Sequence, residues 1–419
     1  MMHNISIAIG IKNAKEIFKE LAISNDTLDS FFERPTKIKP ERKLQELSSF
    51  LKSKSYSYRK RFCEALDLNG EKISVELPPE PTSTPATKIL TTQQPKPIVK
   101  PKPTRRFAPR SDIAVITCFF NPCNFSALIK NYHRFARQLK EQRVPLYTCE
   151  AVFDGQDPQI SYGNVVHVKT DSVLFIKESL LNIAETIVPE QYTKIIFMDC
   201  DFLFSEPDWA WEASYILDEK PVLQCMRNLL DLDEKGMVSR KTHSMAFKID
   251  QGRPGGGWAV HREIFTHLGG LYDKMITGGG DMIHTWGGFF GNMETNGHWM
   301  RQYNRHFQKS WKDWCKPVSR YVRGDIGLLQ VDVAHLFHGT RENRQYVARS
   351  ACVIEVNPDR DLIYNEDGVI TWNLETAPKE AVLCIKDYFE NRKEDCSASG
   401  DIEIIDPEQI NWNDSWLES

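Results

Sequence analysis

The sequence of 419 residues lacks the features that mark several protein classes. It has no apolar run near the ~18–20 residues that a helix needs to cross a bilayer, so no membrane span is expected. Its net charge is −4, which favours neither nucleic acid nor a membrane surface as a bulk partner. Residues 2–11 lack the basic start and the small-residue cleavage site of a signal peptide. These absences predict a cytoplasmic globular protein.

The ten cysteines show no metal-binding pattern. There is no C-x-x-C pair, and Cys118 and Cys123 lack further zinc ligands at a useful spacing. All ten are therefore predicted to be reduced and mostly buried thiols of a cytosolic fold.

Proline marks a boundary in the chain. Nine of the 22 prolines lie within residues 78–109, among Lys, Arg, Ser and Thr, which is typical of an extended spacer. We expect a linker over 78–110. Residues 1–77 before it carry leucines at helical spacing and are predicted to form a small helical accessory module.

From Asp112 onward, apolar runs alternate with amphipathic stretches. This pattern predicts an α/β domain over 111–375 with a mostly parallel sheet, whose ligands bind at the carboxyl ends of the strands. Strands are expected at 113–120, 146–153, 165–168 and 194–198, and helices at 126–141 and 177–187.

Asp199-Cys200-Asp201 directly follows the apolar run that ends at Met198. In an extended backbone residues i and i+2 point to the same side, so the two carboxylates are expected to converge. Oxygen ligands suit Mn²⁺ or Mg²⁺, and such an ion would hold a diphosphate. The alternative is a solvated turn after the strand.

Another carboxylate follows three glycines in Gly278-Gly279-Gly280-Asp281. Asp281 is a candidate general base for an acceptor hydroxyl or amine. The alternative is that Asp281 only caps a helix that begins at Met282.

A His335-x-x-His338 pair follows another apolar run, which predicts a strand over 328–333. An extended backbone would place these two imidazoles on opposite faces, so one metal ligand is expected, and His338 is preferred because Gly339 gives it room. Lys177, Arg341 and Arg344 are candidate phosphate contacts.

Two other segments leave alternatives open. The stretch between Asp281 and His335 is either an acceptor-binding lid or a small helical subdomain with its own core. Its aromatic residues are Trp286, Phe289, Phe290, Trp299, Tyr303, Trp311, Trp314 and Tyr321. Residues 376–419 are predicted to be a helix followed by a solvated acidic tail, with a secretion signal of a bacterial effector, delivered into a host cell, as the alternative.

Taken in order, these motifs resemble the β-1,4-galactosyltransferases and the related polypeptide N-acetylgalactosaminyltransferases. The segment from Phe175 to Asn182 with Asp199-Cys200-Asp201 resembles their helix and DxD motif. The glycine-rich stretches from Gly255 to Phe265 and from Gly269 to Asp281 resemble their carboxyl-terminal motif, and His338 falls where the family has a metal-ligand histidine. The resemblance covers roughly residues 112–350.

The resemblance implies a GT-A fold, a Rossmann-like sheet that binds nucleotide-sugars, and a Mn²⁺-dependent transferase with a UDP-sugar donor. It implies a glycan or protein acceptor. By position, Asp201 and His338 would bind the metal, with Asp199 on the metal or the ribose, and Asp281 would be the base. The remaining donor contacts would be Phe119, Asn121, Asp154, Lys177, Asn182, Gly257, Trp258, Arg341 and Arg344.

The chain also departs from this family. The family motif has a tryptophan and an acidic residue before its aspartate, whereas Thr277 to Gly280 offers neither, which puts the role of Asp281 and the stereochemical course in doubt. Animal members carry a membrane anchor and disulfides, and neither is expected in this chain. The chain therefore more closely resembles soluble bacterial or viral members. Two other functions stay open, an inactive carbohydrate- or nucleotide-binding module and a metal-dependent phosphohydrolase.

Overall fold

The computed structural model describes residues 106–249, 251–293, 303–341, 343–345 and 348–395. The predicted helical module over 1–77, most of the linker over 78–110, and Trp299 lie outside these residues, so those calls remain predictions. Within the described ranges, no helix combines the length and the apolar character that crossing a membrane requires.

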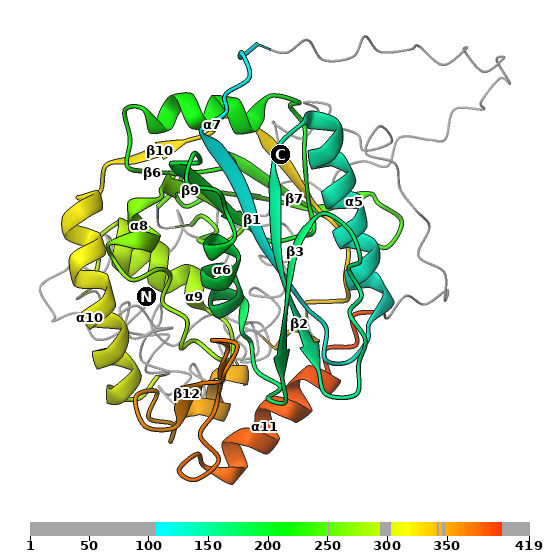
Figure 1. Ribbon diagram of the computed structural model, residues 1–419, viewed down its shortest axis with the longest axis vertical. Coiled ribbons are helices and arrows are strands. Elements are labelled where there is room, and N and C mark those ends of the chain that lie inside the picture. Colours follow the sequence, from blue (N-terminus) through cyan, green and yellow to red (C-terminus); the bar gives the residue numbers. More distant parts are fainter. Residues whose placement is uncertain (1–105, 250, 294–302, 342, 346–347, 396–419) are drawn as a thin grey trace, which may run out of the picture. The chain divides into compact units, whose positions relative to one another are not determined.

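A seven-stranded sheet forms the centre of the described part, in the strand order β10-β6-β9-β4-β1-β2-β3 (Figure 1). Strands β4, β1, β2 and β3 run parallel, whereas β9 is antiparallel to both of its neighbours. The bounds are β1 Ile113–Phe120, β2 Leu146–Phe153, β3 Asn164–Thr170, β4 Lys194–Met198, β6 Val222–Gln224, β9 Gly257–His261 and β10 Ile326–Leu328. The predicted α/β class with a mostly parallel sheet is confirmed.

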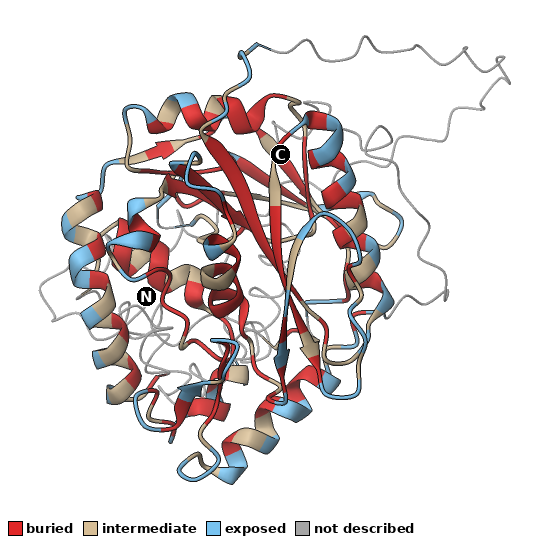
Figure 2. Ribbon diagram, viewed as in Figure 1, coloured by how far each residue is buried: buried red, intermediate tan, exposed pale blue. Residues whose placement is uncertain are grey.

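Helices cover both faces of this sheet because the central strands are apolar on both sides. In β1, Ile113 and Val115 belong to one core with helices α5 (Ser126–Gln142) and α7 (Trp209–Leu217). Ala114 and Ile116 belong to the opposite core with helix α6 (Lys177–Thr186). This alternation with period two is the pattern of a strand buried on both faces, and β1 is buried almost throughout (Figure 2).

A second sheet of four strands has the order β5-β11-β7-β8. Its bounds are β5 Phe202–Phe204, β7 Asn228–Leu232, β8 Val238–His243 and β11 Asp332–His335. The single strand predicted over 328–333 is therefore wrong. The chain leaves β10 at Leu328, continues through buried Leu329 and Val331, and enters β11 in the other sheet, so one apolar run serves two sheets.

The aromatic segment before His335 forms helices. A short α9 (Gly280–Met282) continues into a π-helix, η1 (Ile283–Phe289), and α10 (Arg305–Val322) packs against η1. Phe289, Phe307 and Trp311 are buried in the same core as α6. These side chains lie in helices, as the helical alternative predicted, but they share the core of the sheet, so the separate core of that alternative is wrong.

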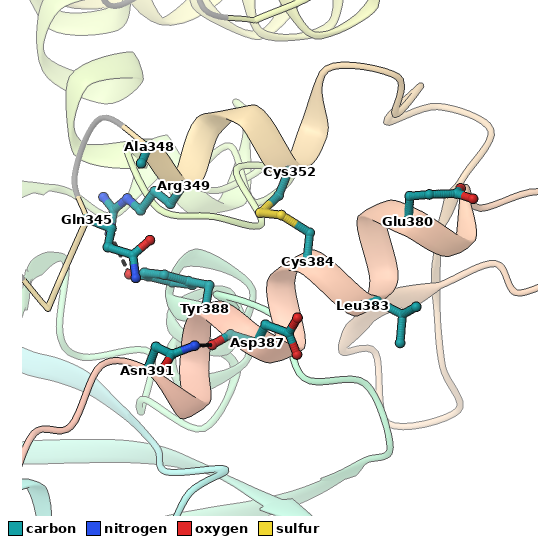
Figure 3. A pocket seen from close by; sticks show the side chains of 10 residues that line it. All are labelled: Gln345, Ala348, Arg349, Cys352, Glu380, Leu383, Cys384, Asp387, Tyr388 and Asn391. Atoms are coloured by element: carbon teal, nitrogen blue, oxygen red, sulfur yellow. Dashed lines mark hydrogen bonds between the residues drawn. A yellow bond between two sulfur atoms is a disulfide. The ribbon is translucent and has the colours of Figure 1, made fainter.

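The carboxyl-terminal elements complete this core. They are η3 (Ala348–Val353), the hairpin β12 (Leu362–Tyr364) and β13 (Ile370–Trp372), and α11 (Lys379–Glu390), which is the helix predicted after residue 376. Figure 3 shows that a disulfide joins Cys352 of η3 to Cys384 of α11 beside a small pocket. The prediction that every cysteine is reduced is wrong for this pair. Disulfides are more typical of proteins outside the cytosol, so the cysteines no longer support a cytosolic assignment.

The disulfide closes a loop between cysteines that are 32 residues apart, so it restricts the unfolded chain. On the chain-entropy model, we expect its loss to lower the free energy of unfolding by about 3–4 kcal/mol. Thermal denaturation with and without reductant measures this. Reductant should lower the Tm of the wild type but leave that of a Cys352→Ser/Cys384→Ser variant unchanged. A wild-type Tm that is insensitive to reductant would contradict the pairing.

Candidate functional site

The carboxyl ends of β1 and β4, the first turn of α6 and the end of β11 face one cleft of about 720 Å³. Ligands of parallel α/β sheets bind at this edge. Many of the residues singled out in the sequence line the cleft, namely Phe119, Asn121, Lys177, Asp199, Asp201, Asp281, His338, Arg341 and Arg344.

Three of the lining side chains form a compact group that could hold a metal ion: Asp201, His335 and His338. The Nε2 atoms of the two imidazoles are 3.2 Å apart. Asp201 Oδ2 lies 2.9 Å from His338 Nε2 and 3.4 Å from His335 Nε2. Two nitrogens and one oxygen therefore converge on one point.

Strand register in the second sheet brings this group together. β11 pairs with β5 so that His335 lies opposite Phe202, the residue after Asp201, and Leu336 N donates to Asp201 O. β11 ends at His335, and the chain turns through Gly339, whose φ is +85°. The prediction that the two imidazoles face opposite sides is wrong, because that rule applies only to continuous extended backbone and His338 lies beyond the strand.

Each histidine is held from behind by a carboxylate. His335 Nδ1 lies 2.9 Å from Asp231 Oδ1, which the pairing of β11 with β7 places directly opposite. His338 Nδ1 lies 2.8 Å from Glu394 Oε2. A carboxylate accepts a hydrogen bond from Nδ1–H, which leaves Nε2 as the ligand atom, and this carboxylate–histidine pattern is common around protein metals.

The charges of the group depend on one another. Burial opposes ionisation of Asp201, but His335 and His338 hold its pKa well below the usual value. Burial also opposes protonation of His335, yet Asp201 and Asp231 raise its pKa to about 9. The remaining oxygen, Asp201 Oδ1, is buried and has no hydrogen-bond partner among the described residues. A divalent cation would satisfy that oxygen and replace the protons between the three side chains, so the donor set fits a metal such as Mn²⁺.

Asp199 has a different partner from Asp201. β4 ends at Met198 and residues 199–201 form a turn, so the two carboxylates do not follow the extended-chain rule that predicted their convergence. Asp199 Oδ1 lies 2.8 Å from Lys177 Nζ, which also lies 2.8 Å from Asp281 Oδ1. One lysine thus bridges Asp199 and the predicted base, and Asp199 lies outside the three-residue group.

Asp281 sits in the first turn of α9, and the residue at the helix cap is Gly279, so the alternative of Asp281 as the cap is wrong. Neighbouring glycines make room for it, since a Cβ on Gly255 would lie 2.5 Å from Asp281 Oδ2. Burial opposes its charge, but Lys177 holds the pKa of Asp281 below the usual value. Asp281 is therefore ionised at neutral pH, as a proton acceptor must be.

A further carboxyl group, Glu178, lies behind Asp281. Its carboxyl packs against Gly280, its side chain is 1% exposed, and Oε2 has no hydrogen-bond partner among the described residues. Burial raises the pKa of Glu178 to about 8. A neutral Glu178 adds no further negative charge to this group, in which Lys177 pairs with both Asp199 and Asp281.

Six arginines line the cleft: Arg240, Arg253, Arg341, Arg344, Arg349 and Arg392. Arg240 and Arg253 pair with Asp231. Arg344 donates to His338 O over 3.4 Å, next to the metal group. Arg349 Nη1 donates to the Tyr388 hydroxyl over 2.9 Å (Figure 3). Guanidinium groups of this kind suit phosphate oxygens.

The other predicted donor contacts divide into two sets. Phe119 and Asn121 line the cleft, but the amide of Asn121 already bonds to Phe125 O, Phe125 N and Gln159. Four residues do not line the cleft, namely Asp154, Asn182, Gly257 and Trp258. Asp154 is exposed, Asn182 bonds to both backbone groups of Leu271, and Gly257 and Trp258 are buried in β9.

Six residues of the site were not predicted from the sequence: His335, Asp231, Glu178, Arg349, Arg392 and Glu394. His335 carried a signal, since a second histidine three residues from a candidate ligand can bind the same ion where a strand ends. Glu394 carried none, because it lies in the acidic run that was predicted to be a solvated tail. That prediction is wrong for Glu394, which is 1% exposed, and residues 396–419 lie outside the described part.

No family model and no curated protein matches this chain. Among solved structures, the catalytic domain of Drosophila β1,4-galactosyltransferase 7, a complex with xylobiose, is 13% identical over 65% of this chain and 98% of its own, with a TM-score of 0.30. A putative glucose-1-phosphate thymidylyltransferase from Bacillus anthracis, in complex with a sucrose, is 9% identical over 61% and 98%, with a TM-score of 0.31.

The mannosyltransferase PcManGT from Pyrobaculum calidifontis, in complex with GDP-Man and Mn²⁺, is 17% identical over 41% of this chain and 51% of its own. Its TM-score is 0.25. Scores and identities this low do not assign the chain to a family, so its function is inferred from its own residues.

Glu178 links stability to pH. Its pKa in the folded protein is about 8, above the usual value, so its contribution is most favourable below about pH 4.5 and is lost as pH rises towards 8. Glu178→Gln keeps the shape of the side chain but removes the group that titrates. We expect the variant to gain Tm relative to the wild type as pH rises from 5 to 8, with exposed Glu190→Gln as the control. Parallel Tm curves for wild type and Glu178→Gln would contradict this pKa.

Proposed function

We propose that this protein is a metal-dependent glycosyltransferase with a GT-A arrangement, which moves a sugar from a UDP-sugar donor to a glycan or protein acceptor. The observation that carries the proposal is the Asp201–His335–His338 group at the ligand-binding edge of a parallel α/β sheet, facing Asp281 across one cleft. The order of these motifs along the chain supports it as well.

In this proposal, Asp201, His335 and His338 would hold the metal through a carboxylate and the two Nε2 atoms. A bound Mn²⁺ or Mg²⁺ would neutralise charge on the diphosphate of the donor. Lys177 and the cleft arginines supply further positive charge at the same edge, where the leaving group gains its negative charge. Asp199 orients Lys177 through their ion pair.

The reaction is a displacement at the anomeric carbon of the donor sugar. A bond forms from the acceptor oxygen or nitrogen to that carbon, and the bond from that carbon to the diphosphate oxygen breaks. The acceptor proton passes to Asp281, and the nucleoside diphosphate leaves with the bonding electron pair. Asp281 suits this role because it is ionised, lines the cleft and is held in place by Lys177.

The released product distinguishes the alternatives. A glycosyltransferase releases a nucleoside diphosphate, whereas a phosphohydrolase that cleaves the diphosphate releases a monophosphate. An inactive binding module would bind the nucleotide and release neither.

The first test is a panel of UDP- and GDP-sugars with Mn²⁺ or with EDTA, in which nucleotide release is followed by chromatography. We expect Mn²⁺-dependent release of UDP from one donor. Asp201→Ala and His335→Ala should abolish it, because each removes a ligand. Asp325→Ala removes an exposed carboxylate that does not line the cleft and should retain it. Release of UMP, or release that persists in EDTA, would contradict the proposal.

A second test concerns Asp281. Replacing it by asparagine keeps its size but removes the proton acceptor, so kcat for the active donor should fall by about 10²–10⁴-fold. The affinity for Mn²⁺ should change little, since Asp281 lies outside the metal group. Steady-state kinetics with a parallel Mn²⁺ titration measure both, and a near wild-type kcat would exclude Asp281 as the base.

A further inference from the structure

The short segment after α11, Arg392 to Asp395, returns to the cleft and is called the clasp here. Its central residue, Glu394, is 1% exposed and uses both carboxylate oxygens. Oε2 accepts from His338 Nδ1 over 2.8 Å, and Oε1 pairs with the Arg392 guanidinium. A buried carboxylate is costly unless it is paired in this way, so these contacts are specific.

The hydrogen bond that Glu394 accepts from His338 determines the orientation of the imidazole. It fixes the tautomer with the proton on Nδ1 and holds the ring so that Nε2 points at Asp201, 2.9 Å away. Without an acceptor at Nδ1, the ring could rotate or place its proton on Nε2, where the proton would block a metal. Glu394 therefore acts on the metal through His338 and does not touch it.

Asp395 fastens the clasp to the body of the protein. Its carboxylate accepts from Ser126 N over 2.7 Å and from Ala127 N over 2.6 Å, at the first turn of α5. The residue before this helix, Phe125, provides no side-chain cap, so these amide groups depend on Asp395. Negative charge at a helix N-terminus is favourable, and here it comes from a residue 269 positions away.

The backbone next to His338 packs closely against the clasp. Gly339 has a φ of +85°, and a Cβ there would lie 3.0 Å from the Cα of Glu394 and 3.2 Å from Lys393 O. A larger residue would press on the clasp at the point where Glu394 meets His338. Arg392 lines the cleft and lies 5.5 Å from the ring centre of Phe389, at the end of α11.

We infer that the clasp is part of the metal centre: Glu394 is a positioning residue that orients His338 for the metal, and Asp395 holds it there. This inference rests on the proposed metal-dependent function. It gives the carboxyl-terminal segment a role in metal affinity, where the sequence suggested only a solvated tail.

Isothermal titration of the full-length protein with Mn²⁺ tests the inference. Glu394→Ala should raise the Kd for Mn²⁺ by about 10–100-fold, the usual cost of losing a partner behind a ligand. Glu394→Gln keeps the size and an acceptor oxygen, so its effect should be smaller. Glu390→Gln makes the same charge change at an exposed position four residues earlier and should leave the Kd unchanged.

The Tm of each variant in EDTA separates positioning from folding. If Glu394 positions His338, Glu394→Gln should raise the Kd for Mn²⁺ while its Tm in EDTA stays near that of the wild type. This result would support the inference. If the wild type binds Mn²⁺, Asp201→Ala abolishes binding, and both Glu394 variants bind like the wild type, then the inference is wrong while the proposed function stands. If the wild type does not bind Mn²⁺, both are overturned.

Discussion

The site depends on two buried hydrogen bonds from histidine to carboxylate, His335 to Asp231 and His338 to Glu394. They turn two Nε2 atoms towards Asp201 from residues on different structural elements. Four segments far apart in the sequence must be in place for this: the turn after β4, strand β7, the end of β11 and the segment after α11. A metal at their meeting point would therefore stabilise the packing of both sheets and of the carboxyl-terminal helix.

The second feature of the cleft is its balance of charge. Lys177, at the start of α6, lies between Asp199 and Asp281, and the neutral Glu178 lies behind them. This arrangement keeps Asp281 ionised in a confined space while adding no net positive charge. The arginines that line the cleft add attraction for an anionic donor. Positive charge beside an ionised carboxylate suits a reaction that removes a proton and releases a diphosphate.

The sequence predicted those parts of the fold that depend on local pattern. Apolar runs gave the bounds of β1, β2 and β4, and helical spacing gave α5 and α6, because hydrophobic period follows directly from burial. Asp201 and His338 could be identified because each lies just beyond a strand. The partners of these residues could not, since Asp231 and Glu394 are chosen by strand register and by a chain reversal that no local spacing encodes. The disulfide between Cys352 and Cys384 could not be predicted for the same reason, because only the packing of the folded chain brings the two cysteines together.

The proposed function requires Asp201, His335 and His338 to bind one divalent metal. Anomalous X-ray scattering from a crystal grown with Mn²⁺ and UDP tests it most directly, because the signal locates the ion without assumptions about activity. One strong peak is expected within bonding distance of a carboxylate oxygen of Asp201 and of Nε2 of both histidines. A peak placed instead between Asp199 and Asp281, or no peak at all in the cleft, would contradict it.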